Sequence, residues 1–312
     1  MAMTLAEASR YAPTPLAQGI METFVIESPL LDRLPLMPIA GNAYAYNMEQ
    51  TLPGVAFRGV NEAYIESTGT IVQATEKLSI LGGDADVDKF LEQTTPSDLG
   101  SLRANQARMK VKSSSYKFQD TFINGDVAVD SKAFDGLKKR IAGSQVIDTA
   151  TNGMGPVAGG HDFFDALDAL MAAVDGGADA LYTNAAIRAR ILSAGRRLGG
   201  AETIREDSTG KRVATWHGVP VLDIGTRADG TPIIPQTETQ GSSSAASSIY
   251  AVKFGQDESD GGTTGITNGG VQVYDLGEID SKPVYRTRIE FYVGLASFGP
   301  KASARLRGVL NS

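Results

Sequence analysis

Alternating apolar and polar residues near the carboxyl end of the chain predict a long, half-buried strand. Over residues 284–295 large apolar side chains and threonine occupy every second position, and mostly arginine, glutamate and tyrosine stand between them. A period of two is that of a strand with one face on the core, and no helical period competes with it. Strands are also predicted at residues 178–184, which read ADALYTN, and at residues 212–222, after a turn.

Helical periodicity is strongest in the segment of residues 101–124, which contains neither proline nor glycine. Its apolar residues fall into two stripes, so we predict a long helix packed on two sides. One stripe consists of Leu102, Met109 and Tyr116, and the other of Ala107, Val111, Phe118 and Phe122. Two shorter helices are predicted at residues 162–175 and 184–198.

Basic residues spaced by seven run along the long helix between its apolar stripes. They are Arg103, Lys110 and Lys117. Such a stripe is typical of an exposed helix face and is also suited to contact with nucleic acid, so both interpretations stay open.

The remaining segments are rich in breakers of regular structure. Five prolines within residues 1–40 favour an arm laid over other surfaces, with a short helix at about residues 16–26. Glycine, serine, threonine and aspartate dominate residues 225–248 and 256–270, which we expect to be surface loops.

Residues 42–80 predict a hairpin with two extended arms around a Pro-Gly centre. Each arm has roughly 20 residues, and at about 3.3 Å per residue it could reach about 60 Å, well beyond the radius of a compact chain of this length. Its tip carries apolar residues among glycines, a surface that an isolated subunit would leave in water. We therefore expect a neighbouring subunit to bury the tip.

Composition and charge narrow the class of protein. The chain of 312 residues is 42% hydrophobic and 21% charged, near the averages for globular domains, and its length suggests about two domains or one domain with large insertions. The absence of cysteine excludes disulfides, thiolate catalysis and Cys-ligated zinc. A net charge of -7 without blocks of one sign argues against a dedicated nucleic-acid-binding surface. The sequence shows neither a long apolar run nor an amino-terminal signal, so we expect a cytoplasmic protein that spans no membrane.

Residues capable of catalysis or metal binding are sparse. The two histidines, His161 and His217, are far apart and have structural explanations at a helix start and after a strand. Asp84, Asp86 and Asp88 alternate, but the glycine and glutamate of a hand-type calcium loop are missing, which favours a solvated or Arg-paired strand face. The segments 205–212 and 261–265 lack the glycine spacing of phosphate or dinucleotide loops.

Four blocks of sequence resemble the major capsid proteins of tailed bacteriophages, which have the Hong Kong 97-like fold. They read SPLLDRLPLMPIAGNAYAYNMEQTLPGVAFRGVNEAYIESTG (28–69), ILGGDADVDKFL (80–91), FFDALDALMAAVDGGADALYTNAAIRARI (163–191) and GGVQVYDLGEIDSKPVYRTRIEFYVGLASFGPKASARLRGVL (269–310). The resemblance implies an α+β protein of that capsid fold with four parts. These are an amino-terminal arm (1–40), an extended hairpin loop (41–80), a peripheral domain with a long spine helix (81–135 and 269–312) and an axial domain (136–268).

The resemblance also implies a structural function without catalytic, cofactor-binding or metal residues. The subunit would assemble with itself as hexamers and pentamers into an icosahedral head shell around phage double-stranded DNA, which it would bind weakly and non-specifically. Contacts with the adjacent subunit would come from Leu52, Val55, Phe57, Arg58, Val60 and Tyr64, and Arg103, Lys110 and Lys117 would be candidates to face the DNA. The protein would belong to the virion after assembly in the host cytoplasm, with separate scaffolding, portal and decoration proteins as further candidate partners.

Two departures limit what the resemblance implies. Some relatives crosslink through a lysine of the extended loop, whereas the tip here offers only Arg58, so we expect no self-crosslinking. Only some 25 residues precede the first matching block, so a scaffold would have to be a separate chain or already removed. The alternatives are an encapsulin-like nanocompartment shell and, from another class, a cytosolic hydrolase whose loop rim would carry Asp257, Glu258 and Asp260.

Overall fold

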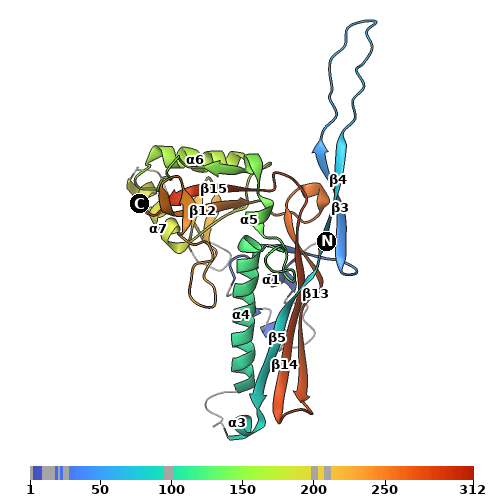
Figure 1. Ribbon diagram of the computed structural model, residues 1–312, viewed down its shortest axis with the longest axis vertical. Helices are drawn as coiled ribbons and strands as arrows, with labels where there is room; N and C mark the ends of the chain where they lie inside the picture. The colour runs from blue at the N-terminus through green and yellow to red at the C-terminus, as the bar shows by residue number, and fades with distance from the viewer. Residues whose placement is uncertain are drawn as a thin grey trace.

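The computed structural model describes most of the chain. The described residues are 3–8, 18–19, 22–23, 28–94, 102–197, 203–206 and 212–312. The short helix expected at about residues 16–26 lies largely outside them. The molecule is elongated: a long sheet with one helix along it forms the lower half of Figure 1, a second sheet with two helices lies above it, and a hairpin stands out from the top.

The long sheet has five strands in the order β1-β2-β13-β14-β5. Their bounds are Met3–Thr4 (β1), Pro35–Pro38 (β2), Thr263–Glu278 (β13), Val284–Ser297 (β14) and Ser79–Asp88 (β5). β2 runs parallel to β13, whereas β14 is antiparallel to both of its neighbours. The period of two predicted for β14 is confirmed, because Ile289, Phe291, Val293 and Leu295 are all buried.

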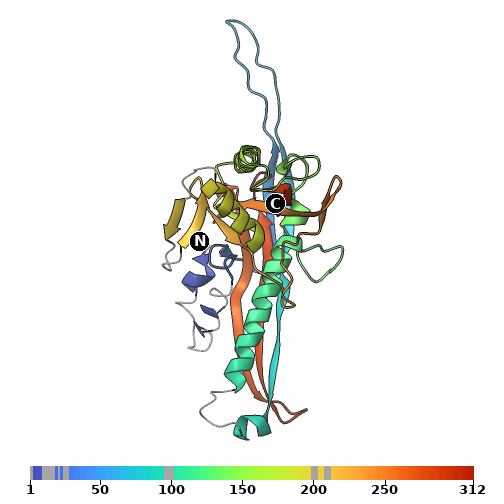
Figure 2. The same ribbon diagram turned by 90° about the vertical axis from the view of Figure 1, so that its left-hand side faces the viewer.

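The predicted long helix is α4 (Leu102–Asn124), which lies along β5 and β14 in both ribbon views (Figures 1 and 2). One of its two predicted stripes, from Ala107 to Phe122, is buried on the sheet. The prediction of packing on two sides is wrong, because Met109 of the other stripe is 65% exposed. The helix packs on the long sheet, and at its carboxyl end Phe122 also contacts Tyr182 of the second sheet, with 6.5 Å between the ring centroids. Neither contact covers Met109.

The second sheet has eight strands in the order β6-β15-β12-β7-β10-β9-β8, with β11 also paired to β12. The strands are β6 (Val146–Asp148), β7 (Ala180–Thr183), β8 (Thr203–Glu206), β9 (Arg212–Trp216), β10 (Val219–Asp223), β11 (Glu238–Gln240), β12 (Ser243–Val252) and β15 (Ser303–Leu310). The helices α6 (His161–Ala172) and α7 (Ala185–Arg197) bury Phe163, Leu167, Ile187 and Ile191 in one core cluster with this sheet. Both helices and the buried strand β7 confirm the sequence predictions.

Two predictions from composition are wrong. The segments expected to be surface loops contain β11 and the beginnings of β12 and β13, where Ser247, Ser248, Thr263 and Thr264 are buried. Hydroxyl side chains can be buried there when they find acceptors: Ser248 donates to Glu238 at 2.5 Å. The single strand expected at residues 212–222 is a hairpin of β9 and β10, because its turn places His217 and Gly218 at positive φ.

Three short helices connect the larger elements: α1 (Leu5–Ala8), α3 (Lys89–Thr94) and α5 (Leu137–Arg140). The last strand, β15, pairs with β12 and β6 in the second sheet. The sheets therefore divide the chain differently from the sequence-based division, which grouped residues 303–310 with the peripheral domain. In the described residues no helix combines the length and apolar character needed to cross a membrane.

Candidate subunit-contact surface

The hairpin consists of β3 (Ala43–Thr51) and β4 (Thr70–Lys77), which pair antiparallel from Ala43↔Lys77 to Thr51↔Thr70. Beyond the strands, residues 52–69 continue outward without a ladder and project far from the rest of the molecule (Figures 1 and 2). Glu62 closes the turn at the end by accepting a hydrogen bond from the backbone N–H of Gly59 at 2.8 Å. Residues 52–69 therefore lie away from every core cluster of their own subunit.

The apolar side chains of the tip lie in solvent. Phe57 has a relative exposure of 108% and Val55 of 95%, and Leu52, Val60 and Tyr64 are also exposed. Arg58, the remaining residue expected at a subunit contact, lies 5.0 Å from the centroid of the Tyr64 ring and donates to the carbonyl of Glu62 at 3.0 Å. The structure thus brings together on one loop all six residues of the predicted contact. It adds Ile65, which is 85% exposed and follows Tyr64 in the same apolar run.

Aromatic rings hold the base of the hairpin against the body. Tyr44 and Tyr46 of β3 both contact Phe298, whose ring meets that of Tyr46 edge-on at 5.1 Å. Ile266 and Ala296 complete this small core. The base is therefore packed in its own subunit, whereas the tip is not.

A hydrogen bond with an acidic partner fixes one of these rings. The hydroxyl of Tyr44 donates to Oε1 of Glu258 at 2.5 Å. This bond, together with partial burial and the negative charge of Glu258, raises the pKa of Tyr44 to about 12. The hydroxyl accordingly stays protonated at neutral pH and links β3 to the segment that precedes β13.

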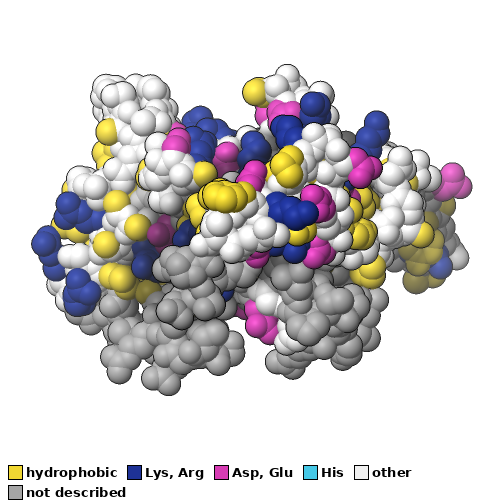
Figure 3. All heavy atoms as spheres, turned by 90° about the horizontal axis from the view of Figure 1, so that it is seen from below, with side chains coloured by type: hydrophobic (Ala, Val, Ile, Leu, Met, Phe, Trp, Pro, Cys, Tyr) yellow, Lys and Arg dark blue, Asp and Glu magenta, His cyan; other side chains and the backbone are white. Residues whose placement is uncertain are grey.

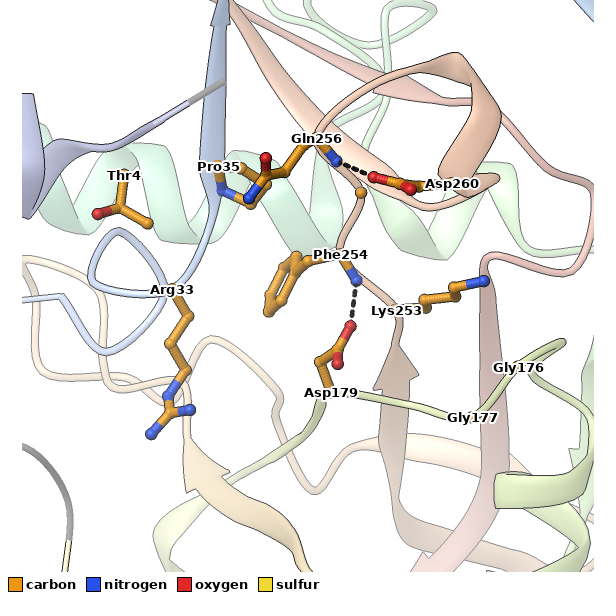
Figure 4. A pocket seen from close by; sticks show the side chains of 11 residues that line it. Thr4, Arg33, Pro35, Gly176, Gly177, Asp179, Lys253, Phe254, Gln256 and Asp260 are labelled. Atoms are coloured by element: carbon orange, nitrogen blue, oxygen red, sulfur yellow. Dashed lines mark hydrogen bonds between the residues drawn. The ribbon is translucent and has the colours of Figure 1, made fainter. Parts of the chain in front are cut away.

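A groove with partly polar walls lies between the β2 region and the second sheet, and its volume is about 730 Å³ (Figure 4). Its acidic side chains already have partners: Asp179 accepts from the backbone N–H of Phe254 and Asp260 from that of Gln256, both at 2.8 Å. Lys253 also lines the groove. No histidine is among the residues that line it.

The other candidates for chemistry are also accounted for. Asp257 accepts from Ser259 and Glu258 accepts from Tyr44, so these two carboxylates of the proposed hydrolase rim serve as loop and strand anchors. His217 lies 3.2 Å from Asp168 at the β9–β10 turn. The other histidine, His161, begins α6 at the surface. Among the described residues there is no group of acidic or histidine side chains that could hold a metal ion.

Comparison with known proteins identifies the architecture. Residues 17–162 match the family model described as Major capsid protein GP7, and this segment includes the hairpin and α4. The matched segment is that of a major capsid protein, and the whole chain has the Hong Kong 97-like fold. It is a structural shell subunit and not an enzyme.

Solved structures resemble the capsid protein over nearly its whole length. The SrpI encapsulin complex of Synechococcus elongatus PCC 7942 matches with a TM-score of 0.65 at 18% identity and covers 100% of this chain and 98% of its own. The capsid of the native GTA particle gives 0.60 at 16% identity, and that of Mycobacterium phage Bobi 0.60 at 13%, each covering 91% of this chain and 90% of its own. Among curated proteins no sequence matches.

The predicted basic stripe of the capsid protein is only partly exposed. Arg103 forms an ion pair with Asp275 and lies 5.1 Å from the centroid of the Tyr285 ring, so it faces the long sheet. Lys110 lies against Gly83 of β5, and Lys117 alone of the three is exposed. Two further basic residues of α4, Arg108 and Lys112, are exposed.

Arginine pairs explain the alternating aspartates. Arg288 forms two hydrogen bonds with Asp84, at 2.7 and 2.9 Å, and Arg286 does the same with Asp86, at 2.7 and 2.6 Å. These bonds lower the pKa of both aspartates. Seen from below, dark blue and magenta side chains lie next to each other on this end of the molecule (Figure 3). The Arg-paired interpretation is therefore confirmed over calcium binding for these two residues.

Proposed function

We propose that the capsid protein assembles as hexamers and pentamers into an icosahedral head shell that encloses phage double-stranded DNA, in the cytoplasm of its host. The exposed apolar tip of the hairpin is the single observation that supports this most directly. Phe57, Val55 and Val60 are almost fully in solvent, although a soluble subunit gains nothing from extending them there. A second copy of the chain would bury them and so convert an unfavourable surface into an interface.

The contact that we propose is heterologous. The tip of one subunit, with Leu52, Val55, Phe57, Arg58, Val60 and Tyr64, would lie on an adjacent subunit that extends its own tip to the next. Head-to-tail contacts of this kind generate rings when the rotation closes. In this arrangement the long sheet with α4 would form the peripheral domain and the second sheet the axial domain.

Electron microscopy of the purified protein tests the proposal. We expect closed particles of at least about 60 copies, the number that icosahedral symmetry requires. Particles isolated from an infected or induced host should hold DNA that resists nuclease until the shell is opened. A protein that stays monomeric under every assembly condition would contradict the proposal.

The similarity to SrpI over the full length of both chains makes a nanocompartment shell the second candidate. Such a shell would have the same subunit fold but would enclose a protein cargo. Mass spectrometry of purified particles separates the two, because a stoichiometric second protein without protected DNA would favour the compartment.

A further inference from the structure

The hairpin sheet shares no ladder with the other two sheets of the described structure, so its direction depends on side-chain contacts and on its two chain connections. Two chain connections join it to the body, Gly41 before β3 and Leu78 after β4. Gly41 has φ +96°, and a Cβ there would meet nothing within 4 Å. A glycine with positive φ gives the connection before β3 conformational freedom, although its carbonyl accepts a hydrogen bond from Nδ2 of Asn268 at 3.0 Å. After β4 the chain continues through Leu78 into β5.

One arginine of α5 links the hairpin to the body. The guanidinium of Arg140 donates from Nη1 and Nη2 to the two carboxylate oxygens of Glu76 on β4, at 2.6 and 2.8 Å. Nη2 also donates to the carbonyl of Leu295 on β14 at 3.0 Å, and Nε to the carbonyl of Asp135 at 2.7 Å. A planar guanidinium that makes two parallel bonds restricts the orientation of its partner as well as its distance.

These contacts lie where β5 leaves the long sheet and continues into β4. Leu295 is two residues beyond Val293, the last residue of β14 that pairs with β5. Gly294, between them, allows a close approach, because a Cβ there would come within 2.8 Å of the carbonyl oxygen of Lys77. The base of β4 is therefore fitted closely against β14 at the height of Arg140.

The helix that carries Arg140 is itself fixed. Lys139 donates to both carboxylate oxygens of Asp126, at 3.0 and 3.2 Å, and Lys138 forms an ion pair with Glu238 of the second sheet at 3.3 Å. The side chains of Arg140 and Glu76 are only 17% and 20% exposed, so the pair is largely protected from water. Partial burial strengthens such a pair relative to one at the surface.

We propose that Arg140 is the positioning residue of the hairpin: through Glu76 it fixes the angle at which the tip is presented to the adjacent subunit. The inference rests on the proposed function in one respect, that the tip contacts a neighbour. The aromatic contacts of Tyr44 and Tyr46 hold β3, and the arginine contact holds β4. Without the arginine, β4 would keep the small apolar contacts of Ala74 and Leu78 and its continuation into β5 but would lose the bidentate bond, and we expect the hairpin to take a wider range of angles.

Spin-label distances in the free subunit test the proposal directly. The chain has no cysteine, so Thr68→Cys in the exposed loop just before β4 and Ser113→Cys on the exposed face of α4 supply two unique labels. We expect one narrow distance distribution in the doubly labelled parent. Glu76→Gln should broaden it or add a second distance, since the amide cannot accept both guanidinium bonds.

The matched control is Glu49→Gln, which makes the same change of charge at an exposed position of β3. It should leave the distribution narrow. Arg140→Lys should give a distribution between those of the parent and Glu76→Gln, because a single ammonium retains the charge but cannot bridge β4 and β14 with the same geometry. An unchanged distribution in Glu76→Gln, with the circular dichroism spectrum of a folded protein, would overturn the proposal.

Assembly gives the second measurement. We expect Glu76→Gln to lower the yield of closed particles relative to Glu49→Gln at equal protein concentration. If the parent itself forms no particles, the proposed shell function fails while the spin-label result still decides the role of Arg140. If Glu76→Gln broadens the distance distribution but assembles like Glu49→Gln, the Arg140–Glu76 pair fixes the hairpin without affecting the subunit contact. That result would overturn the claim that Arg140 positions the tip for the adjacent subunit.

Discussion

Phe118 of α4 packs against Phe291 of β14, with 5.9 Å between the ring centroids, and both side chains are almost completely buried. This contact joins the long helix to the centre of the long sheet. Phe118→Ala should lower the free energy of unfolding of the subunit by about 3 to 5 kcal/mol, because the cavity lies in a core that cannot collapse easily. Met109→Ala, on the exposed side of the same helix, is the control and should change stability little. If Phe118→Ala and Met109→Ala lower the unfolding free energy in urea equally, α4 is not packed with Phe118 on the core side.

Truncating a side chain at the hairpin tip should impair assembly without changing the stability of the free subunit. Phe57→Ala should leave the unfolding free energy of the free subunit unchanged, since the side chain makes no packed contact there. If it fills a pocket of the neighbour, it should weaken each subunit contact by about 2 kcal/mol and lower the yield of closed particles. Val129→Ala, an exposed apolar position away from the hairpin, serves as the control. If Phe57→Ala lowers the unfolding free energy of the free subunit as well as the yield of particles, Phe57 is packed within its own subunit and the proposed interface is wrong.

Acid should weaken the second sheet through Glu238. Burial raises the pKa of this carboxyl, but the hydrogen bond from Ser248 and the charges of Arg305 and Lys138 outweigh burial and keep the pKa below its ordinary value of 4.5. A lowered folded-state pKa contributes its full stability above that ordinary value and loses it as the pH falls through the lowered one.

Glu238→Gln should therefore cost about 1 to 3 kcal/mol at neutral pH. The difference from the parent should narrow as the pH falls from about 5 to about 3, where the parent carboxylate also becomes neutral. Urea titrations of both proteins across this range measure the difference. If the difference in unfolding free energy between the two proteins stays constant down to pH 3, the ionised carboxylate of Glu238 is not what stabilises the sheet.

Mature particles should show no covalent ladder on denaturing gels. Residues 51–69 of the hairpin contain no lysine, and a guanidinium such as that of Arg58 is a poor acyl acceptor. Multimers that survive boiling in detergent would disprove this expectation and point to a bond elsewhere.

DNA retention should depend on Lys117 more than on the other two members of the predicted stripe. Replacing Arg103, Lys110 and Lys117 together by glutamine should leave empty shells forming but lower DNA retention, most clearly at low salt. Because Arg103 pairs with Asp275, its replacement alone should destabilise the sheet slightly without a large effect on DNA. Lys117→Gln is the cleaner test, and unchanged retention in it would leave the lysine as an ordinary exposed side chain.

Local periodicity was enough to predict elements in which buried residues recur at one regular spacing along the whole element. β14 alternates and α4 carries a continuous apolar stripe to Phe122, so both were predicted from the sequence. The beginning of β13 and most of β12 were missed because serine, threonine and glycine are typical of loops. Their burial depends on partners such as Glu238 and Arg305, which become neighbours only in the folded sheet.

The exposure of the apolar tip residues could be predicted from the sequence because they stand among glycines between two extended arms. The residue that we infer to orient them could not. Arg140 and Glu76 are 64 positions apart, and nothing in the local sequence of either distinguishes it from an exposed charge. Arg103 shows the converse, since its spacing of seven from Lys110 indicated a free stripe although its partner, Asp275, lies 172 positions away.

The strand β4 continues through Leu78 directly into β5, so residues 70–88 follow one extended path from the hairpin to the far end of the long sheet. A pull exerted on the tip by a neighbour would therefore act as tension along this path. β5 is bonded to β14 over its whole length, from Val293↔Ser79 to Val284↔Asp88, and tension parallel to the strands loads these hydrogen bonds in shear, all at once. A subunit built in this way would pass internal pressure on to its neighbours without having its sheet opened one bond at a time.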